Sequence, residues 1–558
     1  MRTKIALVTI FLIAFFLRFY KLSDFRCLNW DEAAFAYNSY SVSETGADEY
    51  GTYLPLQFKS VGDYKAPLYI YLMVPVIKVL GLNEFAVRII PSLLGSTTVV
   101  LVYFVTYLLF KNRNLALVSS LFLSISPWHL QFTRAGADVS VSNFLVVLGI
   151  LGFFLGVSGK RYGYIFSFVS FGLSIYTYFG ERLFVPLISL FLTIFFFKKV
   201  QKKKINFVLG ILFGAILILP ILSSLFSEGH REKILKTTIF GYKRSEEYVQ
   251  QIKKEDQSGI FYYLFHTALL ENTWGSINRY LNHFSLIFLF FEGVSKDPRQ
   301  SIYGMGLLYL FDLPLLLIGA YSLIKSRNRN KYFVLGWLLL APIPAAITRD
   351  LTSGRRSLNM LIPLLIISSF GFLKVSDKWR RLNKLPRIIT GLIMGLVFIY
   401  FMAFYFASYY VFSNNRSFAG PSGWHCGYKE LVEYISPIKN NYREIVVDTS
   451  YQGPYVFFLF YEKYSPEKYQ AQARLIQDSP DSLGEGIGYD NYIFRPIYWP
   501  RDRCLEKRLF AGPPERLPDK DIKKGEAEII EKIYFQNGRE AFRLVRVIKS
   551  DKTYCSNL

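Results

Sequence analysis

Two adjacent carboxylates, Asp31 and Glu32, are the side chains in this sequence whose type and spacing could do chemistry. They follow the first hydrophobic segment and stand between Trp30 and a small-residue stretch that begins at Ala33. A positioned carboxylate can take a proton from an acceptor hydroxyl, while nearby cations stabilise an anionic leaving group. An isolated pair of this kind would more often be a solvated helix N-terminus, where negative charge suits the helix dipole.

The elements that must position this pair are long apolar runs. Hydrophobic residues make up 52% of the chain, and they cluster rather than spread evenly. A run of about 18 or more residues with few charges is long enough to cross the hydrocarbon layer as a helix. We therefore predict a mostly α polytopic transmembrane bundle of about eleven spans. The predicted spans cover roughly 5–22, 88–110, 115–133, 139–158, 162–180, 183–197, 205–226, 302–324, 332–348, 358–373 and 388–412.

The positive charge lies mainly in short loops between these runs. The formal net charge is +23, and much of the excess falls at 198–204, 325–331 and 374–387. The positive-inside rule places such loops in the cytoplasm, which favours a topology signal over nucleic-acid binding.

The stretch 66–82 decides the orientation of the chain. It is apolar but contains Pro67, Pro75 and Lys78. If it crossed the membrane, all three basic loops would face outside; if it lies along the outer surface, all three face inside. We predict the second arrangement, a multi-pass cell (plasma) membrane protein whose active site and C-terminal domain are extracytoplasmic.

This topology predicts two domains, a transmembrane domain over 1–412 and an extracytoplasmic domain over 413–558. The first outer loop, 23–87, carries the acidic pair, and a second long outer loop covers 227–301. In the last part of the chain, Glu444 to Asp448 is β-branched and predicts a buried strand, and Asn537-Gly538 predicts a hairpin turn. A small mixed α/β domain is expected there.

The four cysteines, Cys27, Cys426, Cys504 and Cys555, would all face outside in this topology. Disulfides are compatible with that location, and four cysteines allow three pairings. Whether they are free or paired stays open.

Further acids and cations would share the outer face with the acidic pair. Asp138 is either an active-site acid or the N-cap of the next span. Arginine suits phosphate because its planar fork can bind two oxygens, although a lone cation can also snorkel to headgroups. The candidate substrate-binding residues are Lys65, Arg134, Arg182, Arg355, Arg356, Asp63 and Tyr178.

The metal content is left open. The five histidines are scattered and form no ligand set. Glu32 could bind a divalent cation or hydrogen-bond an acceptor, so such an ion stays an option without being predicted.

Five short segments carry a family pattern: 29–33, 65–69, 83–92, 126–138 and 348–363. As a set they resemble motifs of the polytopic type C glycosyltransferases. The resemblance is strongest to the branch of the protein O-mannosyltransferases and the lipid A aminoarabinose transferase, glycosyltransferase family 39. It covers roughly residues 1–412.

The resemblance implies an inverting sugar transfer from a polyprenyl-phosphate donor to a hydroxyl acceptor. Asp31 matches the catalytic acid of the first loop, which would act as general base, and Asp138 matches the acid of the second loop. Arg356 matches a late-loop arginine that would face lipid phosphate. Ser353 stands where that loop usually has a histidine, and Ala66 stands where the first loop usually has a proline.

Two other classes of function compete with this one. A transporter or flippase for lipid-linked glycans would also need a basic groove, but it predicts charges at the bilayer midplane, and here the charges lie mainly at span ends. A non-catalytic receptor would have no use for the acidic pair except as solvated surface. The expected partners are the lipid bilayer, a polyprenyl-phosphate sugar and a protein, glycan or glycolipid acceptor.

Overall fold

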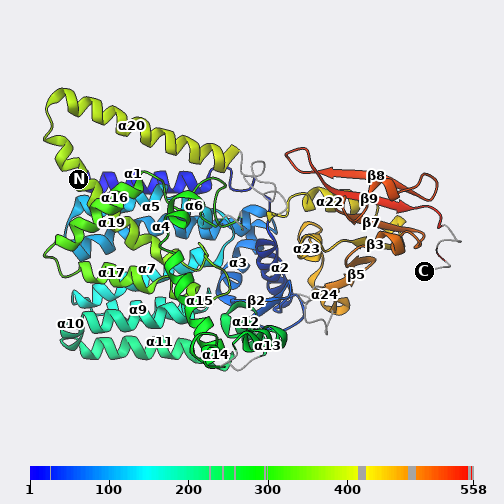
Figure 1. Cartoon of the computed structure of the whole chain (residues 1–558), viewed down its shortest axis with the longest axis horizontal. Helices are drawn as coiled ribbons and strands as arrows, with labels where there is room; N and C mark the ends of the chain where they lie inside the picture. Colours follow the sequence, from blue (N-terminus) through cyan, green and yellow to red (C-terminus); the bar gives the residue numbers. More distant parts are fainter. Residues whose placement is uncertain are drawn as a thin grey trace. The chain divides into compact units, whose positions relative to one another are not determined.

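The chain folds into two compact units, and each unit joins two separate stretches of sequence. The helical unit contains 1–20 and 91–407, and the loop–sheet unit contains 21–90 and 408–558. This computed structural model (Figure 1) describes residues 1–24, 27–224, 228–241, 244–256, 259–294, 297, 299–411, 423–475, 486–550 and 555. The predicted boundary at 412–413 lies outside the described residues.

The helical unit consists of apolar helices that run alongside one another (Figure 1). Its helices that lie in the predicted spans are α1 (Arg2–Phe19), α4 (Glu84–Phe110, with the unit boundary inside it), α5 (Arg113–Ile125), α6 (Pro127–Arg134), α7 (Asp138–Val157), α8 (Gly163–Ile175), α9 (Glu181–Phe195), α11 (Lys204–Ser224), α16 (Asp312–Lys325), α17 (Lys331–Leu340), α18 (Ile343–Ala346), η3 (Leu358–Met360), α19 (Leu361–Arg380) and α20 (Lys384–Phe406). The other described helices of this unit are α10 (Phe197–Gln201), α12 (Glu228–Thr237), η1 (Ile239–Gly241), α13 (Glu246–Glu255), α14 (Ile260–Phe265), α15 (Ala268–Asn282) and η2 (Ile287–Phe291).

Small residues let some of these helices approach closely. A Cβ on Gly319 of α16 would collide with the carbonyl oxygen of Ile367, and a Cβ on Gly371 of α19 would collide with that of Leu315. Membrane helices commonly use small residues in this way, because close packing replaces the hydrophobic driving force that lipid removes.

Five described helices are long and apolar enough to cross a membrane by length and composition. They are Glu84–Phe110, Asp138–Val157, Lys204–Leu222, Leu358–Arg380 and Lys384–Tyr409. A sixth candidate is the pair α5 and α6, which bends by 55° at its break. The mostly helical membrane fold is therefore as predicted, while the count of about eleven spans stays a prediction.

Two of the predicted spans illustrate how the observed helices differ from them. The run 115–133 is divided at Ser126, because Pro127 begins a new helix whose N-cap is the Ser126 hydroxyl. The run 302–324 is helical only from Asp312 onward. In both cases apolar composition predicted more helix than the backbone forms.

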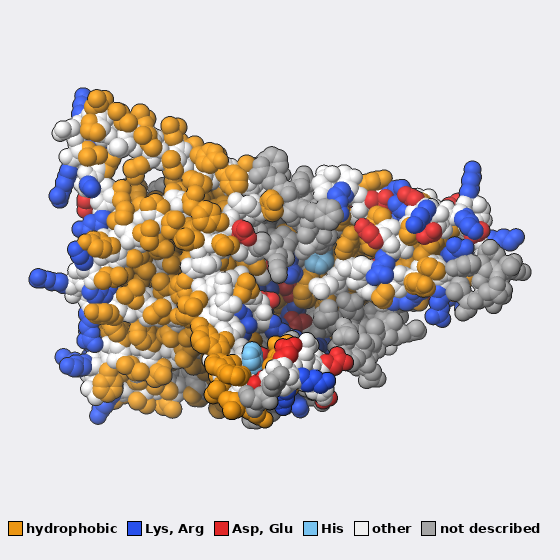
Figure 2. All heavy atoms as spheres, viewed as in Figure 1, with side chains coloured by type: hydrophobic (Ala, Val, Ile, Leu, Met, Phe, Trp, Pro, Cys, Tyr) orange, Lys and Arg blue, Asp and Glu red, His pale blue; other side chains and the backbone are white. Residues whose placement is uncertain are grey.

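Hydrophobic and basic side chains occupy different parts of the surface of the helical unit. Figure 2 shows hydrophobic side chains over its visible face, and lysines and arginines gathered at its left end, where Figure 1 places α10. That end includes the basic loop predicted at 198–204. The pattern fits a bundle whose sides contact lipid and whose one end carries a band of positive charge.

Residues 23–87, predicted as the first outer loop, lie in the loop–sheet unit. This loop contains α2 (Trp30–Thr45), α3 (Pro67–Leu80) and a hairpin of β1 (Phe58–Ser60) and β2 (Asp63–Lys65). The α3 helix has 14 residues, or about 21 Å of length, which is less than the roughly 30 Å of hydrocarbon. This length fits the prediction that 66–82 does not cross.

The C-terminal part is a seven-stranded mixed sheet in the order β4-β5-β6-β3-β7-β9-β8. Its strands are β3 (Glu444–Val447), β4 (Arg474–Leu475), β5 (Gly486–Tyr489), β6 (Tyr492–Phe494), β7 (Arg508–Gly512), β8 (Ala527–Tyr534) and β9 (Glu540–Val547). Its helices are α22 (Tyr428–Ile435), η5 (Lys439–Asn441), α23 (Pro454–Tyr461), α24 (Pro466–Gln472), α25 (Trp499–Asp502) and η6 (Asp519–Asp521).

Both predictions of β structure in this part are confirmed. Strand β3 lies at the centre of the sheet, parallel to β6 and β7, and its inner residues are buried. Strands β8 and β9 pair antiparallel around Gly538, whose φ of 80° explains why the turn requires glycine.

The first loop packs against this C-terminal part, a grouping that the sequence did not predict. Helix α2 lies against α23 and α24. The Tyr455 hydroxyl donates to the buried Glu49 carboxylate (2.7 Å) and accepts from the Val61 N–H (2.8 Å). The cysteines, whose state was open, form two disulfides, Cys27–Cys426 and Cys504–Cys555.

Candidate functional site

Helix α2 begins with a capping box. The side-chain oxygen of Asn29 accepts the Glu32 N–H at 3.1 Å, and the Glu32 carboxylate accepts the Asn29 N–H at 3.0 Å. The two residues thus satisfy each other's backbone donors at the helix start. This box fixes the first turn of α2, and Asp31 is part of that turn.

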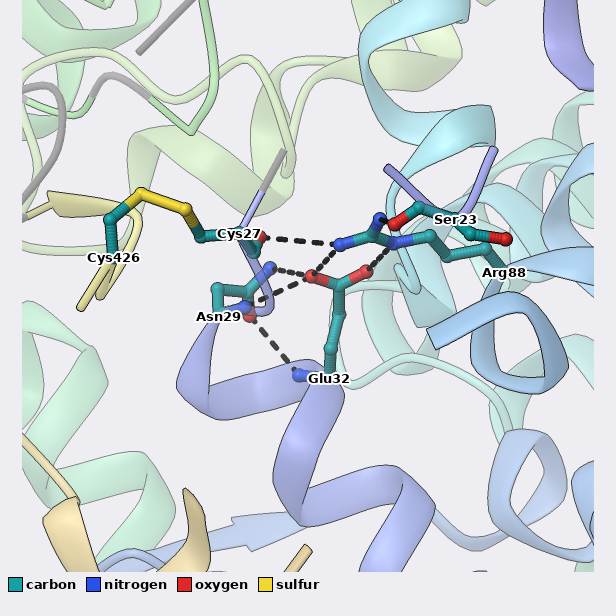
Figure 3. The surroundings of a disulfide bond; sticks show 6 residues. All are labelled: Ser23, Cys27, Asn29, Glu32, Arg88 and Cys426. Atoms are coloured by element: carbon teal, nitrogen blue, oxygen red, sulfur yellow. Dashed lines mark hydrogen bonds and ion pairs between the residues drawn. A yellow bond between two sulfur atoms is a disulfide. The ribbon is translucent and has the colours of Figure 1, made fainter. Parts of the chain in front are cut away.

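Glu32 is fully engaged by other residues and does not face solvent. Its Oε1 lies 2.7 Å from Nε of Arg88, and both side chains are 0% exposed. Its Oε2 also accepts from the Asn29 amide at 2.8 Å and from Nη2 of Arg88 at 3.3 Å (Figure 3). The sequence grouped Glu32 with the catalytic residues, and that role stays a prediction. The contacts show a buried carboxylate that pairs with Arg88 and completes the capping box.

Asp31 has a different environment one residue earlier. Its carboxylate forms an ion pair with Nζ of Lys65, and its side chain stays 13% exposed. Lys65 ends β2 and is itself nearly buried; its ammonium lies 4.2 Å from the centre of the Trp30 ring and 3.7 Å from Asp63. The predicted residues Asp31, Lys65 and Asp63 therefore form one cluster, and Asp31 is a partly accessible carboxylate beside the ammonium of Lys65.

The helical unit carries a second charged cluster, at the start of α7. Oδ1 of Asp138 accepts from Nη2 of Arg355 at 2.6 Å, and from the Val139 N–H at 2.8 Å. The Arg355 guanidinium lies 5.8 Å from the centre of the Tyr178 ring.

Arg356 lies on the same loop as Arg355 and stays partly exposed. It forms an ion pair with Asp350, and Nη1 lies 3.4 Å from the Thr348 hydroxyl. Its side chain is 22% exposed, and that of Asp350 is 57% exposed. An arginine held by one exposed carboxylate can exchange that partner for a phosphate at low cost.

Hydrogen bonds to His283 and Gln300 fix the loop that carries both arginines. Nε2 of His283 accepts the Ser353 N–H at 3.1 Å, while Nδ1 of the same ring donates to the Arg279 carbonyl at 2.7 Å. The Gln300 amide oxygen accepts from Ser353 and from the Arg355 N–H at 3.0 Å. The sequence analysis missed His283 and Gln300, because each is a lone residue in a long loop with no motif around it.

A buried polar chain lies at the start of α9. Oε1 of Glu181 accepts from the Asn359 amide at 2.9 Å, and the Asn359 oxygen accepts from Asn143 at 2.9 Å. This chain links three helices near Asp138. Asn359 falls in one of the family-like segments, which was the only sequence signal for it.

Two predicted substrate-binding arginines have other contacts. Arg134 is fully buried, and its guanidinium donates to the carbonyls of Leu17 (2.5 Å) and Tyr20 (2.7 Å) at the C-terminal end of α1. It therefore caps α1, where cations suit the helix dipole, and its role in substrate binding stays a prediction. Arg182 lies 4.2 Å from the ring of its neighbour Phe179.

The described part of the chain shows no set of ligands for a metal ion. No group of three or more His, Cys, Asp and Glu side chains comes together there in a way that could hold an ion. The cation beside Asp31 and Asp63 is the ammonium of Lys65.

The fold is similar to those of two solved proteins. It is similar to ArnT from Cupriavidus metallidurans bound to undecaprenyl phosphate, with 11% identity, a TM-score of 0.56 and 97% of both chains covered. It is also similar to the oligosaccharyltransferase AglB from Archaeoglobus fulgidus in complex with an inhibitory peptide and a dolichol-phosphate, with 13% identity and a TM-score of 0.50. That match covers 82% of this chain and 63% of the archaeal one, so this chain spans less than two thirds of that protein.

The sequence also matches one family model directly. Residues 64–223 match the dolichyl-phosphate-mannose-protein mannosyltransferase family. No curated protein sequence matches this chain significantly. The predicted resemblance to glycosyltransferase family 39 is thus confirmed over those residues, and over the rest of the chain the solved structures show a similar fold.

Proposed function

We propose that this protein is an integral-membrane inverting glycosyltransferase. It moves a sugar from a polyprenyl-phosphate donor to a hydroxyl acceptor. The family match over 64–223 and the fold shared with a protein bound to undecaprenyl phosphate support this class. The proposal rests mainly on the different exposure of two neighbouring acids at the start of α2. Glu32 forms a buried ion pair with Arg88, whereas the Asp31 side chain is partly exposed.

Asp31 is the general base of the proposed reaction. Its carboxylate takes the proton of the acceptor hydroxyl as that oxygen attacks the anomeric carbon. The bond from the anomeric carbon to the phosphate oxygen breaks in the same step, so the configuration at carbon inverts. The ammonium of Lys65 forms an ion pair with this carboxylate.

The leaving group is polyprenyl phosphate, and Arg356 and Arg355 are the side chains proposed to bind it. Both belong to one loop, both are partly exposed, and both now pair with carboxylates. Guanidinium groups bind phosphate oxygens bidentately and stabilise the charge that develops as the bond breaks. Asp138 then orients Arg355, and the ring of Tyr178 packs beside it.

The site is proposed to face the extracytoplasmic side of a cell membrane. Two disulfides in the loop–sheet unit support this side, because such bonds persist in oxidising compartments. The basic loops of the helical unit support the opposite side as cytoplasmic. The acceptor is a hydroxyl of a protein, a glycan or a glycolipid.

The test is direct incubation of the purified protein in detergent or nanodiscs with a panel of polyprenyl-phosphate sugars and hydroxyl acceptors. We expect released polyprenyl phosphate and a glycosylated acceptor with at least one donor, and neither product from Asp31→Asn. Movement of the lipid-linked sugar across vesicles without any transfer product would replace the proposal with a flippase. Equal turnover by Asp31→Asn and the unmodified chain would remove Asp31 from the mechanism.

A further inference from the structure

The described residues that lead into α2, 21–24 and 27–29, are held by the buried guanidinium of Arg88. Nη1 of Arg88 donates to the carbonyls of Leu22 (3.1 Å) and Ser23 (3.2 Å), and Nη2 donates to that of Cys27 (3.2 Å) (Figure 3). One buried guanidinium therefore holds this segment by its backbone and holds α2 through Glu32.

The same segment has one covalent anchor, the disulfide from Cys27 to Cys426. Cys426 is 4% exposed and comes just before α22. The first residue of α22, Tyr428, stacks on Phe457 of α23 with ring centres 4.4 Å apart and planes 6° apart. The far end of the disulfide is thus fixed in the packed part of the sheet domain.

From these contacts we infer that the Cys27–Cys426 disulfide positions Asp31. Cys27 lies two residues before the N-cap Asn29, and Asp31 belongs to the first helical turn. The bond ties the backbone just ahead of that turn to α22, while Arg88 ties it from the other side. Cys27 and Cys426 are positioning residues: neither needs to touch substrate, and both act through the placement of the Asp31 carboxylate. This inference rests on the proposed function.

Loss of the bond should affect turnover more than donor binding. Catalytic groups displaced by about 1 Å can cost on the order of 100-fold in rate. Here Arg88 still holds the segment, so we expect about a tenfold loss of kcat. The donor phosphate is proposed to bind Arg355 and Arg356 of the helical unit, and KM for the donor should therefore stay within about twofold.

The second disulfide provides a matched control. Cys504 and Cys555 are 51 residues apart, and both lie in the C-terminal part of the loop–sheet unit. Removing this bond also deletes a cross-link and two thiols, but it leaves the entry to α2 unchanged.

The experiment compares C27S/C426S with C504S/C555S for kcat and KM. Because the first variant could fail to fold, C504S/C555S is also purified oxidised, reduced after folding, and then reoxidised, with thiols counted by mass spectrometry. We expect reduction to lower its kcat about tenfold with KM for the donor unchanged, and reoxidation to restore it. C27S/C426S should start at the low kcat and be insensitive to reductant.

A readout independent of activity separates this inference from the proposed function. Carbodiimide labels accessible carboxylates, and Asp31 is only 13% exposed while the bond is intact. We expect faster labelling of Asp31 after reduction of C504S/C555S. Unchanged kcat and unchanged labelling would overturn the inference, as would equal losses in both cysteine variants. If no donor is turned over at all, the proposed function fails, and the labelling still decides the positioning role.

Discussion

The first turns of α2 and α7 each carry an aspartate paired with a basic side chain, yet they differ in how the helix is capped. At α2, Asn29 and Glu32 cap the helix, and Asp31 is left 13% exposed beside Lys65. At α7 the N-cap residue is Ala137, which offers no side-chain acceptor. Asp138 itself accepts a backbone N–H of that turn, and its side chain is 7% exposed.

The residues that cap a helix decide whether an aspartate in its first turn must accept a backbone N–H. Where neighbouring residues satisfy the backbone donors, the aspartate can take part in proton transfer. Where no neighbour does so, the aspartate serves the helix and an arginine. The two acids should therefore respond differently to the same substitution.

The sharpest test of the comparison replaces each aspartate by asparagine. Asp31→Asn should lower kcat by about 10²- to 10⁴-fold, because the general base is lost. Its thermal unfolding temperature should fall only modestly, because Lys65 keeps the Asp63 carboxylate at 3.7 Å. Asp138→Asn should lower the free energy of unfolding by about 1–3 kcal/mol, because it weakens a buried charged hydrogen bond, with a smaller loss of kcat. Kinetics and thermal unfolding in the same detergent measure both, and identical profiles for the two variants would break the comparison.

The next test concerns Glu32, which completes the capping box beside Asp31. Glu32→Gln leaves the Arg88 guanidinium buried without its carboxylate, and removing one partner of a buried ion pair costs about 3–5 kcal/mol. We expect a large fall in unfolding temperature. The double variant Glu32→Gln with Arg88→Met should recover part of it, since the unpaired charge is gone. A stable Glu32→Gln variant with lost activity would support Glu32 as a catalytic residue.

A third test uses another buried acid of the loop–sheet unit, Glu49. Burial raises the pKa of Glu49 from 4.5 to about 7. The folded state thus keeps a proton that the unfolded state loses, so this contribution is complete below pH 4.5 and disappears as the pH rises to 7. The free energy of unfolding should fall by roughly 3 kcal/mol over that range.

Denaturant unfolding at several pH values measures this slope. Glu49→Gln should flatten it, whereas Glu44→Gln, at an exposed position of α2, should leave it intact. A slope that is the same in all three proteins would assign the pH dependence to other groups.

The smallest effect is expected in the loop of the helical unit. Arg356→Lys should raise KM for the donor about fivefold to tenfold, because lysine loses the bidentate geometry, which is worth about 1 kcal/mol. Arg349→Ala is the matched control: Arg349 lies in the same loop but donates to the Leu235 carbonyl at 2.8 Å. If both variants raise KM equally, the effect belongs to the loop and not to a phosphate contact.

Sequence alone predicted the parts of the structure that depend on local pattern. The apolar runs predicted helices, Asn537-Gly538 predicted the β8–β9 hairpin, and the first-loop motif brought Asp31 and Lys65 together as candidates. The spacing of Asn29 and Glu32 is that of a capping box, so the structural role of Glu32 could have been derived from it.

The roles of Arg134 and Arg88 and the packing of the first loop could not be predicted, because they depend on partners that are remote in sequence. Arg134 has the composition of a phosphate-binding cation, and only its contact with α1 identifies it as a helix cap. Arg88 reaches Glu32 from 56 residues away. The packing of the first loop on α23 joins segments from the two ends of the chain, which no local periodicity can report.

The Cys27–Cys426 bond also sets an order of events during biosynthesis. Its two sulfur atoms are separated by 399 residues, and at roughly 5–20 residues per second the ribosome needs about 20–80 s to make the second after the first. For that time the opening loop waits with an unpaired thiol, and a chain cut short before position 426 never closes the bond. The stretch that is made first is therefore among the last to be completed.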